Sequence, residues 1–173
     1  QTRGWFYTLT VLAVALFDKP AVKNIIVNGI VMAEDGKKMS KRLRNYTPPD
    51  TLIDTYGADA LRLYLIHSGL VKAEAQRFSD QGVRDIARKV LLPWFNACKF
   101  FTTYAEIDGW CLDKHHAAPH TILDQWLISR CESLKQNIET HMAAYELDHV
   151  VPDLLHFIDE LTNGYVRLNR HRF

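Results

Sequence analysis

The sequence lacks the features that mark several classes of protein. Its 173 residues include three cysteines, Cys98, Cys111 and Cys131, and no CxxC pair. An odd, scattered set argues against a disulfide framework or a zinc site and is typical of a reducing compartment. The adjacent His115 and His116 lie in a stretch with the composition of a solvated loop, and no metal site is predicted there. The formal net charge is only +1, so contact with nucleic acid requires local patches of charge.

Long apolar runs and repeats are also missing. The apolar stretch Leu9–Phe17 is too short to span a bilayer, and no basic segment precedes it as in a signal peptide. We therefore expect no membrane partner. The sequence opens on Gln1-Thr2-Arg3 without an initiator methionine, from which we expect a fragment of a longer protein. Apolar residues make up 47% and charged residues 24%, an ordinary balance for a soluble globular protein.

The chain is organised around one basic stretch. It reads Gly36-Lys37-Lys38-Met39-Ser40-Lys41-Arg42. Asp35 precedes it and forms an Asp-Gly pair with Gly36, the strongest short hairpin signal. Residues 37–44 hold five cations and no acid. A glycine-hinged cationic loop suits a polyphosphate, because a lysine ammonium group is compact and sits on a flexible stem. A solvated basic hairpin tip is the alternative, and composition alone does not separate the two.

The segments before and after this stretch predict a small α/β portion. Residues 3–17 have helical spacing with Trp5 as a core aromatic, and Ile25–Val27 has the uniform apolar character of a buried parallel strand. Asp50 is expected to cap a helix that ends at Gly57, and a second helix follows over residues 58–65. Residues 71–79 are polar and form the candidate linker.

From Asp80 onward the pattern is wholly helical, which favours an α-helical bundle. We expect Pro93 to kink the first of these helices. The aromatic stripe that follows is expected to be core rather than a base-stacking platform; it comprises Trp94, Phe95, Phe100 and Phe101. Thr121 or Asp124 is expected to cap the next helix, and Val151-Pro152-Asp153 to lead into the last.

Two motifs resemble the catalytic part of a known family. Lys38-Met39-Ser40-Lys41-Arg42 resembles the KMSKS signature of class I aminoacyl-tRNA synthetases, with Arg at the last position as in archaeal and eukaryotic-type isoleucyl enzymes. Gln1-Thr2-Arg3-Gly4-Trp5-Phe6 is similar to the end of the Gly-x-Asp-Gln-x-Arg-Gly-Trp-Phe segment of isoleucyl-tRNA synthetases. In that family this segment lines the pocket for the aminoacyl-adenylate.

Two further motifs follow in the order of the same family. The stretch from Tyr56 to Arg62 is similar to the Tyr-Gly-Ala-Asp-Ala-Leu-Arg element of the stem-contact region, where we expect Asp59 and Arg62 to form a structural ion pair. Residues 163–170 resemble the Asn-Trp-Tyr-x-Arg-x-x-Arg helix of the anticodon-binding domain. Gly164 replaces the usual Trp and is expected to loosen that helix.

The resemblance implies a mainly α fold with a small α/β portion. Residues 1–47 would be the C-terminal part of a Rossmann-like catalytic domain with the KMSKR loop. Residues 48–78 would be stem-contact helices, and residues 79–173 part of an α-helical anticodon-binding domain.

The implied function is that of a cytoplasmic isoleucine–tRNA ligase, of which this fragment alone is expected to be inactive. Such an enzyme activates isoleucine with ATP, accompanied by Mg²⁺, and transfers the acyl group to tRNA(Ile); the rest of the synthetase chain is then a further partner. The resemblance assigns catalysis to Lys38 and Lys41, and ATP binding to these two with Gly29, Met39 and Ser40. It assigns the adenylate to Gln1, and tRNA phosphates to a basic terminus made of Arg167, Arg170 and Arg172.

Three alternatives stay open from the sequence. Valyl or leucyl specificity would share the loop and the bundle, although residues 1–6 favour isoleucine. A non-catalytic tRNA-binding relative would be expected to have lost Lys38 and Lys41, both of which are present. An unrelated helical interaction domain with a basic hairpin would show no dependence on nucleotides.

Overall fold

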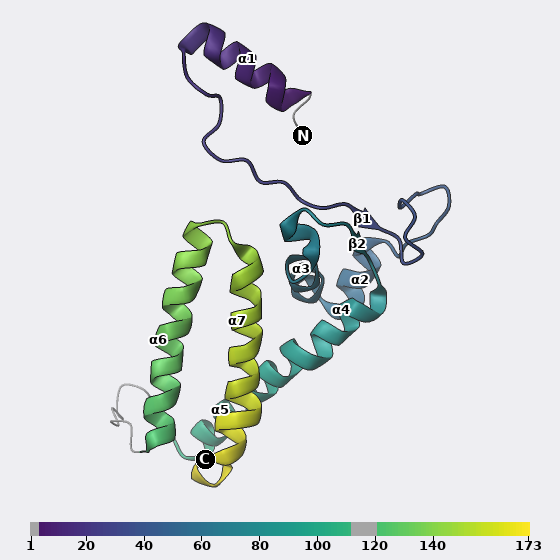
Figure 1. Ribbon diagram of the computed structural model, residues 1–173. Coiled ribbons are helices and arrows are strands. Elements are labelled where there is room, and N and C mark those ends of the chain that lie inside the picture. The colour runs from purple at the N-terminus through teal and green to yellow at the C-terminus, as the bar shows by residue number, and fades with distance from the viewer. Residues whose placement is uncertain (1–3, 112–120) are drawn as a thin grey trace.

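The computed structural model describes residues 4–111 and 121–173, which form three parts along the chain (Figure 1). The first part is helix α1 (Trp5–Phe17) with an extended segment after it. The second is built around a two-stranded sheet and comprises β1 (Val31–Met32), α2 (Pro49–Tyr56), α3 (Ala58–Ile66), the 3₁₀ turn η1 (Gly69–Lys72), β2 (Gln76–Arg77) and α4 (Asp80–Ile86). The third is helical and comprises the π-helical turn η2 (Ala87–Leu91), α5 (Leu92–Ile107), α6 (Ile122–Ala143), α7 (Leu147–Asp159), the π-helical turn η3 (Glu160–Val166) and the 3₁₀ turn η4 (Arg170–Arg172). The mainly α fold with a small α/β portion is confirmed.

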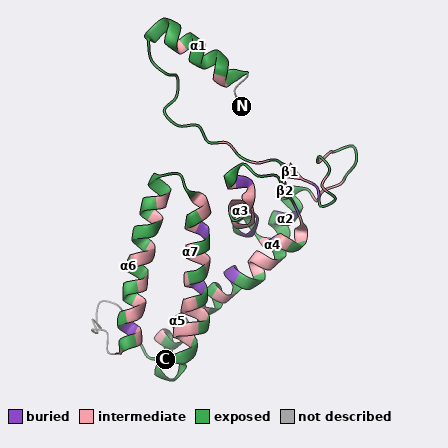
Figure 2. Cartoon of the chain, in the orientation of Figure 1, coloured by how far each residue is buried: buried purple, intermediate pink, exposed green. Residues whose placement is uncertain are grey.

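Helix α1 and the segment after it lie apart from the other elements (Figure 1). The helix ends at Phe17 as predicted, but it buries none of its residues, and Trp5 is 77% exposed (Figure 2). The prediction of Trp5 as a core aromatic is therefore wrong within this chain. The predicted strand Ile25–Val27 is also wrong, because Ile25 and Ile26 are exposed and no described segment pairs with them. A parallel strand forms only where neighbouring strands satisfy its backbone and cover its faces.

The sheet is a parallel pair of β1 and β2, with Val31 opposite Gln76 and Met32 opposite Arg77. The pairing extends beyond the strands, since the Gln76 N–H donates to the Ile30 carbonyl at 2.9 Å and the Phe78 N–H to the Met32 carbonyl at 2.9 Å. Residues 71–79 are thus not a linker. They contain the end of η1 and the whole of β2 and are integrated into the second part of the chain.

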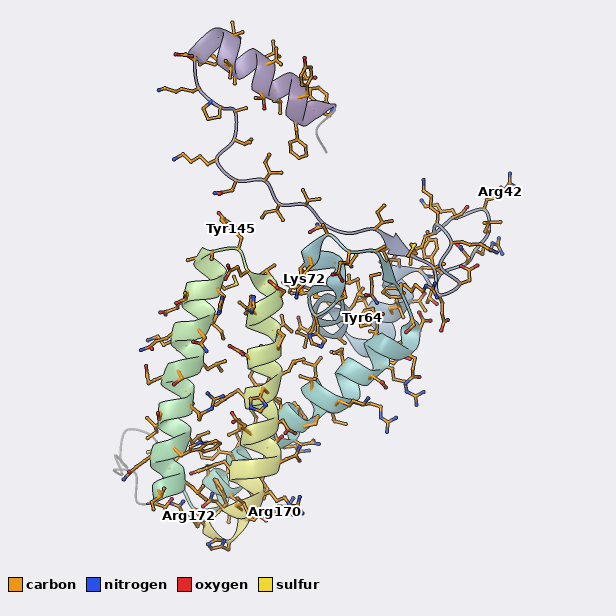
Figure 3. All side chains as sticks on the ribbon, viewed as in Figure 1. Arg42, Tyr64, Lys72, Tyr145, Arg170 and Arg172 are labelled. Carbon is orange, nitrogen blue, oxygen red and sulfur yellow. The ribbon has the colours of Figure 1, made fainter. Side chains whose placement is uncertain are left out.

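The core of the second part lies where α2, α3 and α4 meet β2. Its buried members are Leu52, Ala60, Leu61, Phe78 and Val83. The Tyr64 ring packs edge-on against Phe78 with ring centroids 5.4 Å apart, and Figure 3 shows Tyr64 between α3 and the sheet. Its hydroxyl accepts a hydrogen bond from the Ser79 N–H at 3.3 Å. This side chain therefore joins α3 to the start of α4.

The predicted pair of helices α2 and α3 is confirmed, but the cap of α2 differs. Pro48 occupies the N-cap position without a side-chain cap, and Asp50 lies in the first turn instead. A carboxylate there still stabilises the helix through the helix dipole. The helix ends at Gly57 as predicted, and the φ of 86° at this position is one that glycine adopts without strain. The Asp59–Arg62 ion pair forms at 3.7 Å between exposed side chains.

Helices α4, η2 and α5 follow one another without a break (Figure 1). The kink expected at Pro93 stays a prediction, but the π-helical turn η2 ends two residues before the proline. Proline has no N–H to donate and its ring crowds the preceding turn, so a widened turn accommodates it. Helix α5 buries none of its residues, and Phe95 is 62% exposed, so the prediction of its aromatic stripe as core is wrong.

Helices α6 and α7 form an antiparallel hairpin. Both predicted caps of α6 act together, because the Thr121 hydroxyl accepts from the Asp124 N–H at 3.2 Å and the Asp124 carboxylate accepts from the Thr121 N–H at 3.0 Å. Pro152 lies inside α7, which begins at Leu147, so the prediction that it precedes the helix is wrong. Gly164 lies in η3.

A buried carboxylate ties the end of the chain to the start of α6. Asp124 receives the Arg172 guanidinium at 2.6 and 2.9 Å and the Tyr165 hydroxyl at 2.7 Å. Asn169, also buried, accepts from the same guanidinium at 3.1 Å. The pKa of Arg172 is raised, chiefly by its hydrogen bond to Asp124, so the ion pair favours the charged guanidinium.

Gly82 of α4 provides a test of the packing around Tyr64. A Cβ at Gly82 would lie 2.3 Å from the Tyr64 ring carbon Cε2. Alanine in place of glycine normally stabilises a helix by up to about 1 kcal/mol, whereas overpacking costs about 1–3 kcal/mol. We expect Gly82→Ala to lower the unfolding midpoint of the intact protein. Gly164→Ala is the control, because its Cβ would meet no atom within 4 Å, and it should raise the midpoint or leave it unchanged.

Tyr165 predicts a dependence of stability on alkaline pH. Burial, and then its hydrogen bond to Asp124, raise the pKa of Tyr165 above its ordinary value of 10.0. A raised pKa in the folded state means that the stabilisation is complete below pH 10 and is lost as the pH rises through the folded pKa. The unfolding midpoint of the wild type should therefore exceed that of Tyr165→Phe at pH 8, and the difference should shrink toward pH 11. A difference that stays constant over this range would contradict the assignment.

Candidate functional site

The basic loop, residues 37–44, leaves β1 through a tight hairpin turn. The Gly36 N–H donates to the Ala33 carbonyl and the Ala33 N–H to the Lys37 carbonyl, both at 2.8 Å. Gly36 has a φ of 79°, which glycine adopts without strain. Met32 and Lys38 then form an antiparallel bridge, and the predicted hairpin is confirmed.

The first cation of the loop has an acidic partner. The Asp35 carboxylate accepts a hydrogen bond from the Lys37 N–H at 3.0 Å and lies 3.5 Å from the Lys37 ammonium. The pKa of Asp35 is lowered, chiefly by that backbone hydrogen bond. Lys37 is therefore partly neutralised at the turn.

The far end of the loop is closed by Asn45. Its carbonyl oxygen accepts from the Ser40 N–H at 2.9 Å, and its amide nitrogen donates to the Lys38 carbonyl at 3.2 Å. Between these two points, the Met39 side chain packs against the core cluster. The sequence analysis missed Asn45, although asparagine is a frequent residue where a side chain replaces backbone hydrogen bonds in a turn.

Three further cations of the loop extend into solvent. Lys38, Lys41 and Arg42 are exposed, and their side chains make no hydrogen bond or ion pair with any part of the chain that the structure describes. Arg42 lies at the tip, away from the helices (Figure 3). An open hollow of about 520 Å³ borders the loop beside Lys41, Arg44 and Tyr46. The arrangement presents mobile positive charges on a fixed base, as binding of a polyphosphate requires.

Gly29 lies where two backbones approach each other closely. Its N–H donates to the Leu70 carbonyl at 2.8 Å, and a Cβ at this position would lie 1.6 Å from the Glu74 carbonyl oxygen. The packing of η1 and β2 against the β1 segment therefore requires a glycine here. The predicted contact with a nucleotide base stays a prediction.

The predicted tRNA-binding arginines differ from one another in their surroundings. Arg167 and Arg170 are exposed, and Figure 3 shows Arg170 at the end of the α6–α7 hairpin. The Arg172 guanidinium is instead held by Asp124. Arg42 of the loop lies far from Arg170 and Arg172, so these two regions do not form one site (Figure 3). Gln1 and the pair His115 and His116 lie outside the described residues.

The described residues hold neither a cluster of metal ligands nor a helix that could span a membrane. Within residues 4–111 and 121–173, no three His, Cys, Asp or Glu side chains gather as ligands for a metal ion. Over the same ranges, no helix has both the length and the apolar character to cross a membrane.

Comparison with known families matches two segments of the chain. The family described as tRNA synthetases class I (I, L, M and V) matches residues 1–79. The family described as the anticodon-binding domain of tRNA ligase matches residues 124–173. The two matches follow the order that the four motifs predicted.

Similar proteins match along the whole chain. It is 54% identical to an isoleucine–tRNA ligase of Chlamydia muridarum over 173 residues, which is 100% of this chain and 17% of the relative. It is 54% identical to the cytoplasmic isoleucine–tRNA ligase of Mus musculus, covering 99% of this chain and 14% of the relative. The cytoplasmic enzyme of Schizosaccharomyces pombe is 51% identical, with 99% and 17% covered. The chain thus spans about a sixth of the length of these relatives.

A solved structure supports the fold. LeuRS of Agrobacterium radiobacter, crystallised in a ternary complex with tRNA and LeuAMS, aligns with 96% of this chain and 21% of its own, with a TM-score of 0.65 and 17% sequence identity. At this identity the match bears on the fold alone. The family matches and the identities along the whole chain show that it belongs to the class I aminoacyl-tRNA synthetases, and within them to the isoleucyl-tRNA synthetases.

Proposed function

We propose that the protein containing this chain is an isoleucine–tRNA ligase, and that the basic loop binds the phosphates of ATP during activation of the amino acid. One observation carries the proposal. The loop is fixed at its base by the hairpin turn and Asn45, yet Lys38 and Lys41 extend freely into solvent. The 54% identity to isoleucine–tRNA ligases along the whole of this chain supports the choice of amino acid.

The reaction has two steps. The isoleucine carboxylate attacks the α-phosphorus of ATP in line, and the bond to the leaving pyrophosphate breaks, which gives isoleucyl-adenylate. The 3′-terminal adenosine of tRNA(Ile) then takes the acyl group and releases AMP. Because the nucleophile is already ionised, the first step needs positioning and charge stabilisation more than acid–base catalysis.

Different residues of the loop would bind ATP and stabilise the charge of the leaving pyrophosphate. Lys38 and Lys41 would neutralise charge that develops on the leaving pyrophosphate, and Ser40 would supply a neutral donor. The Met39 backbone would lie near the adenine, which is compatible with its side chain packing against the core. Gly36 would act as the hinge of the loop. Mg²⁺ would arrive bound to ATP.

The other end of the chain would contact tRNA. Arg167 and Arg170 are exposed on the matched anticodon-binding segment and would bind phosphates, a contact that weakens with salt. Arg172 would contribute less directly, because Asp124 holds its guanidinium. Residues 1–47, 48–78 and 79–173 would belong to the catalytic, stem-contact and anticodon-binding domains. The names of the eukaryotic relatives support a cytoplasmic location.

Exchange of pyrophosphate into ATP tests the substrate. With the intact protein, exchange should be strongest with isoleucine, compared with valine and leucine at equal concentrations. If exchange is strongest with valine or leucine, the protein is still a class I synthetase, but its amino-acid substrate is not isoleucine. No exchange with any of the three would leave a tRNA-binding relative without this activity. The 173-residue fragment alone should show no turnover.

Substitution within the loop tests its role. Losing one preorganised cationic donor typically costs on the order of 100-fold in rate, so Lys41→Ala should reduce exchange by about that factor with little change in the KM for isoleucine. Lys37→Ala is the matched control, because Lys37 is already paired with Asp35, and it should cost at most a few-fold. Equal effects of the two substitutions would show that only net charge matters and would contradict the assignment of Lys41.

A further inference from the structure

We infer that Asn45 is a positioning residue for amino-acid activation, because its amide group closes the basic loop and fixes the backbone that carries Lys38 and Lys41. This inference rests on the proposed function of the loop. Asn45 itself would touch no substrate, since both ends of its amide already bond to the loop backbone at 2.9 and 3.2 Å.

The two hydrogen bonds of Asn45 hold the loop on either side of Met39. One is made to the carbonyl of Lys38 and the other to the N–H of Ser40, the residues directly before and after Met39. The Met39 side chain packs against the core cluster. The backbone at this point is therefore held by the amide and by apolar packing.

The chain between these anchors is shaped so that Asn45 comes back to Lys38. The Arg44 N–H donates to the Ser40 carbonyl at 3.0 Å, closing a single turn over residues 40–44. Arg44 then adopts a φ of 47°, a left-handed conformation that few non-glycine residues take without support from their surroundings. This reversal brings the Asn45 side chain opposite Lys38, which is what makes the two hydrogen bonds possible.

The two hydrogen bonds that Asn45 makes to Lys38 and Ser40, here called the clamp, require an amide side chain. An ionised Asp at this position retains an acceptor for the Ser40 N–H but has no donor for the Lys38 carbonyl, and Ala has neither. Without the clamp, the two lysines would sample more positions before the leaving pyrophosphate forms. A loss of this kind lowers kcat more than it changes KM for an amino acid bound elsewhere.

A double-mutant cycle in the intact enzyme tests the inference by pyrophosphate exchange. We expect Asn45→Ala and Asn45→Asp to lower kcat on the order of 10- to 100-fold, with the KM for isoleucine within about two-fold of the wild type. In an enzyme that already carries Lys41→Ala, Asn45→Ala should lower kcat by a much smaller factor. The effects of two substitutions are not additive when one residue acts through the other. Full additivity with Lys41→Ala would overturn the inference, since Asn45 would then act independently of the loop lysine.

A second measurement does not depend on activity. Trypsin can cleave the loop after Lys38, Lys41, Arg42 and Arg44, and loss of the clamp should speed cleavage at these sites by about 10-fold at an unchanged unfolding midpoint. Thr47→Ala is the control, because the Thr47 hydroxyl bonds to Asp80 at 2.6 Å outside the loop, and it should leave cleavage in the loop unchanged. Unchanged cleavage in Asn45→Ala would overturn the inference. If Asn45→Ala is cleaved faster but Lys41→Ala has a normal exchange rate, the structural role of Asn45 is supported and the proposed function of the loop is refuted.

Discussion

The parallel pairing of β1 with β2 is the constraint on which the rest of the structure depends. It joins residues 29–32 to residues 70–78 by backbone hydrogen bonds, and so brings the segment after α3 back to the base of the basic loop. The approach is so close that Gly29 has no room for a side chain. With this pairing in place, Phe78 enters the core and α4 starts from a fixed point. The long helix through α5 then carries the α6–α7 hairpin away from the loop (Figure 1).

The basic loop combines a rigid base with free ends, and this division follows from where its hydrogen bonds lie. Backbone groups at the base are paired within the hairpin and with the Asn45 amide. The ammonium groups of Lys38 and Lys41 extend outward on four-carbon stems. A fixed backbone reduces the entropy lost when a phosphate is bound, whereas the flexible stems allow the charges to follow a phosphate group that moves during reaction.

At the C-terminal end of the chain, the charge of Arg172 stabilises the fold through an ion pair with Asp124. Three cations close in sequence have different surroundings there: Arg167 and Arg170 are exposed, whereas Arg172 reaches the buried carboxylate of Asp124. An ion pair of low exposure requires further hydrogen bonds to offset its desolvation, and Tyr165 and Asn169 supply them. The ion pair between Lys72 and Asp148, at 3.1 Å, similarly joins η1 to the start of α7.

Features that depend on neighbours along the chain could be predicted from the sequence: the turn at Gly36, the end of α2 at Gly57, the start of α6 near Thr121 and the helical character of the bundle. It also identified the family, because four motifs occur in one order. Tertiary structure alone decided which apolar stretches are covered and which polar side chains are paired. Ile25–Val27 has the composition of a buried strand, but burial requires partners that the described part of the chain does not provide. Residues 71–79 look polar enough for a linker, yet β2 forms because β1 offers its backbone groups. Asn45 and Arg172 resemble ordinary surface residues in the sequence, and only the return of the chain toward Lys38 and Asp124 gives them their partners.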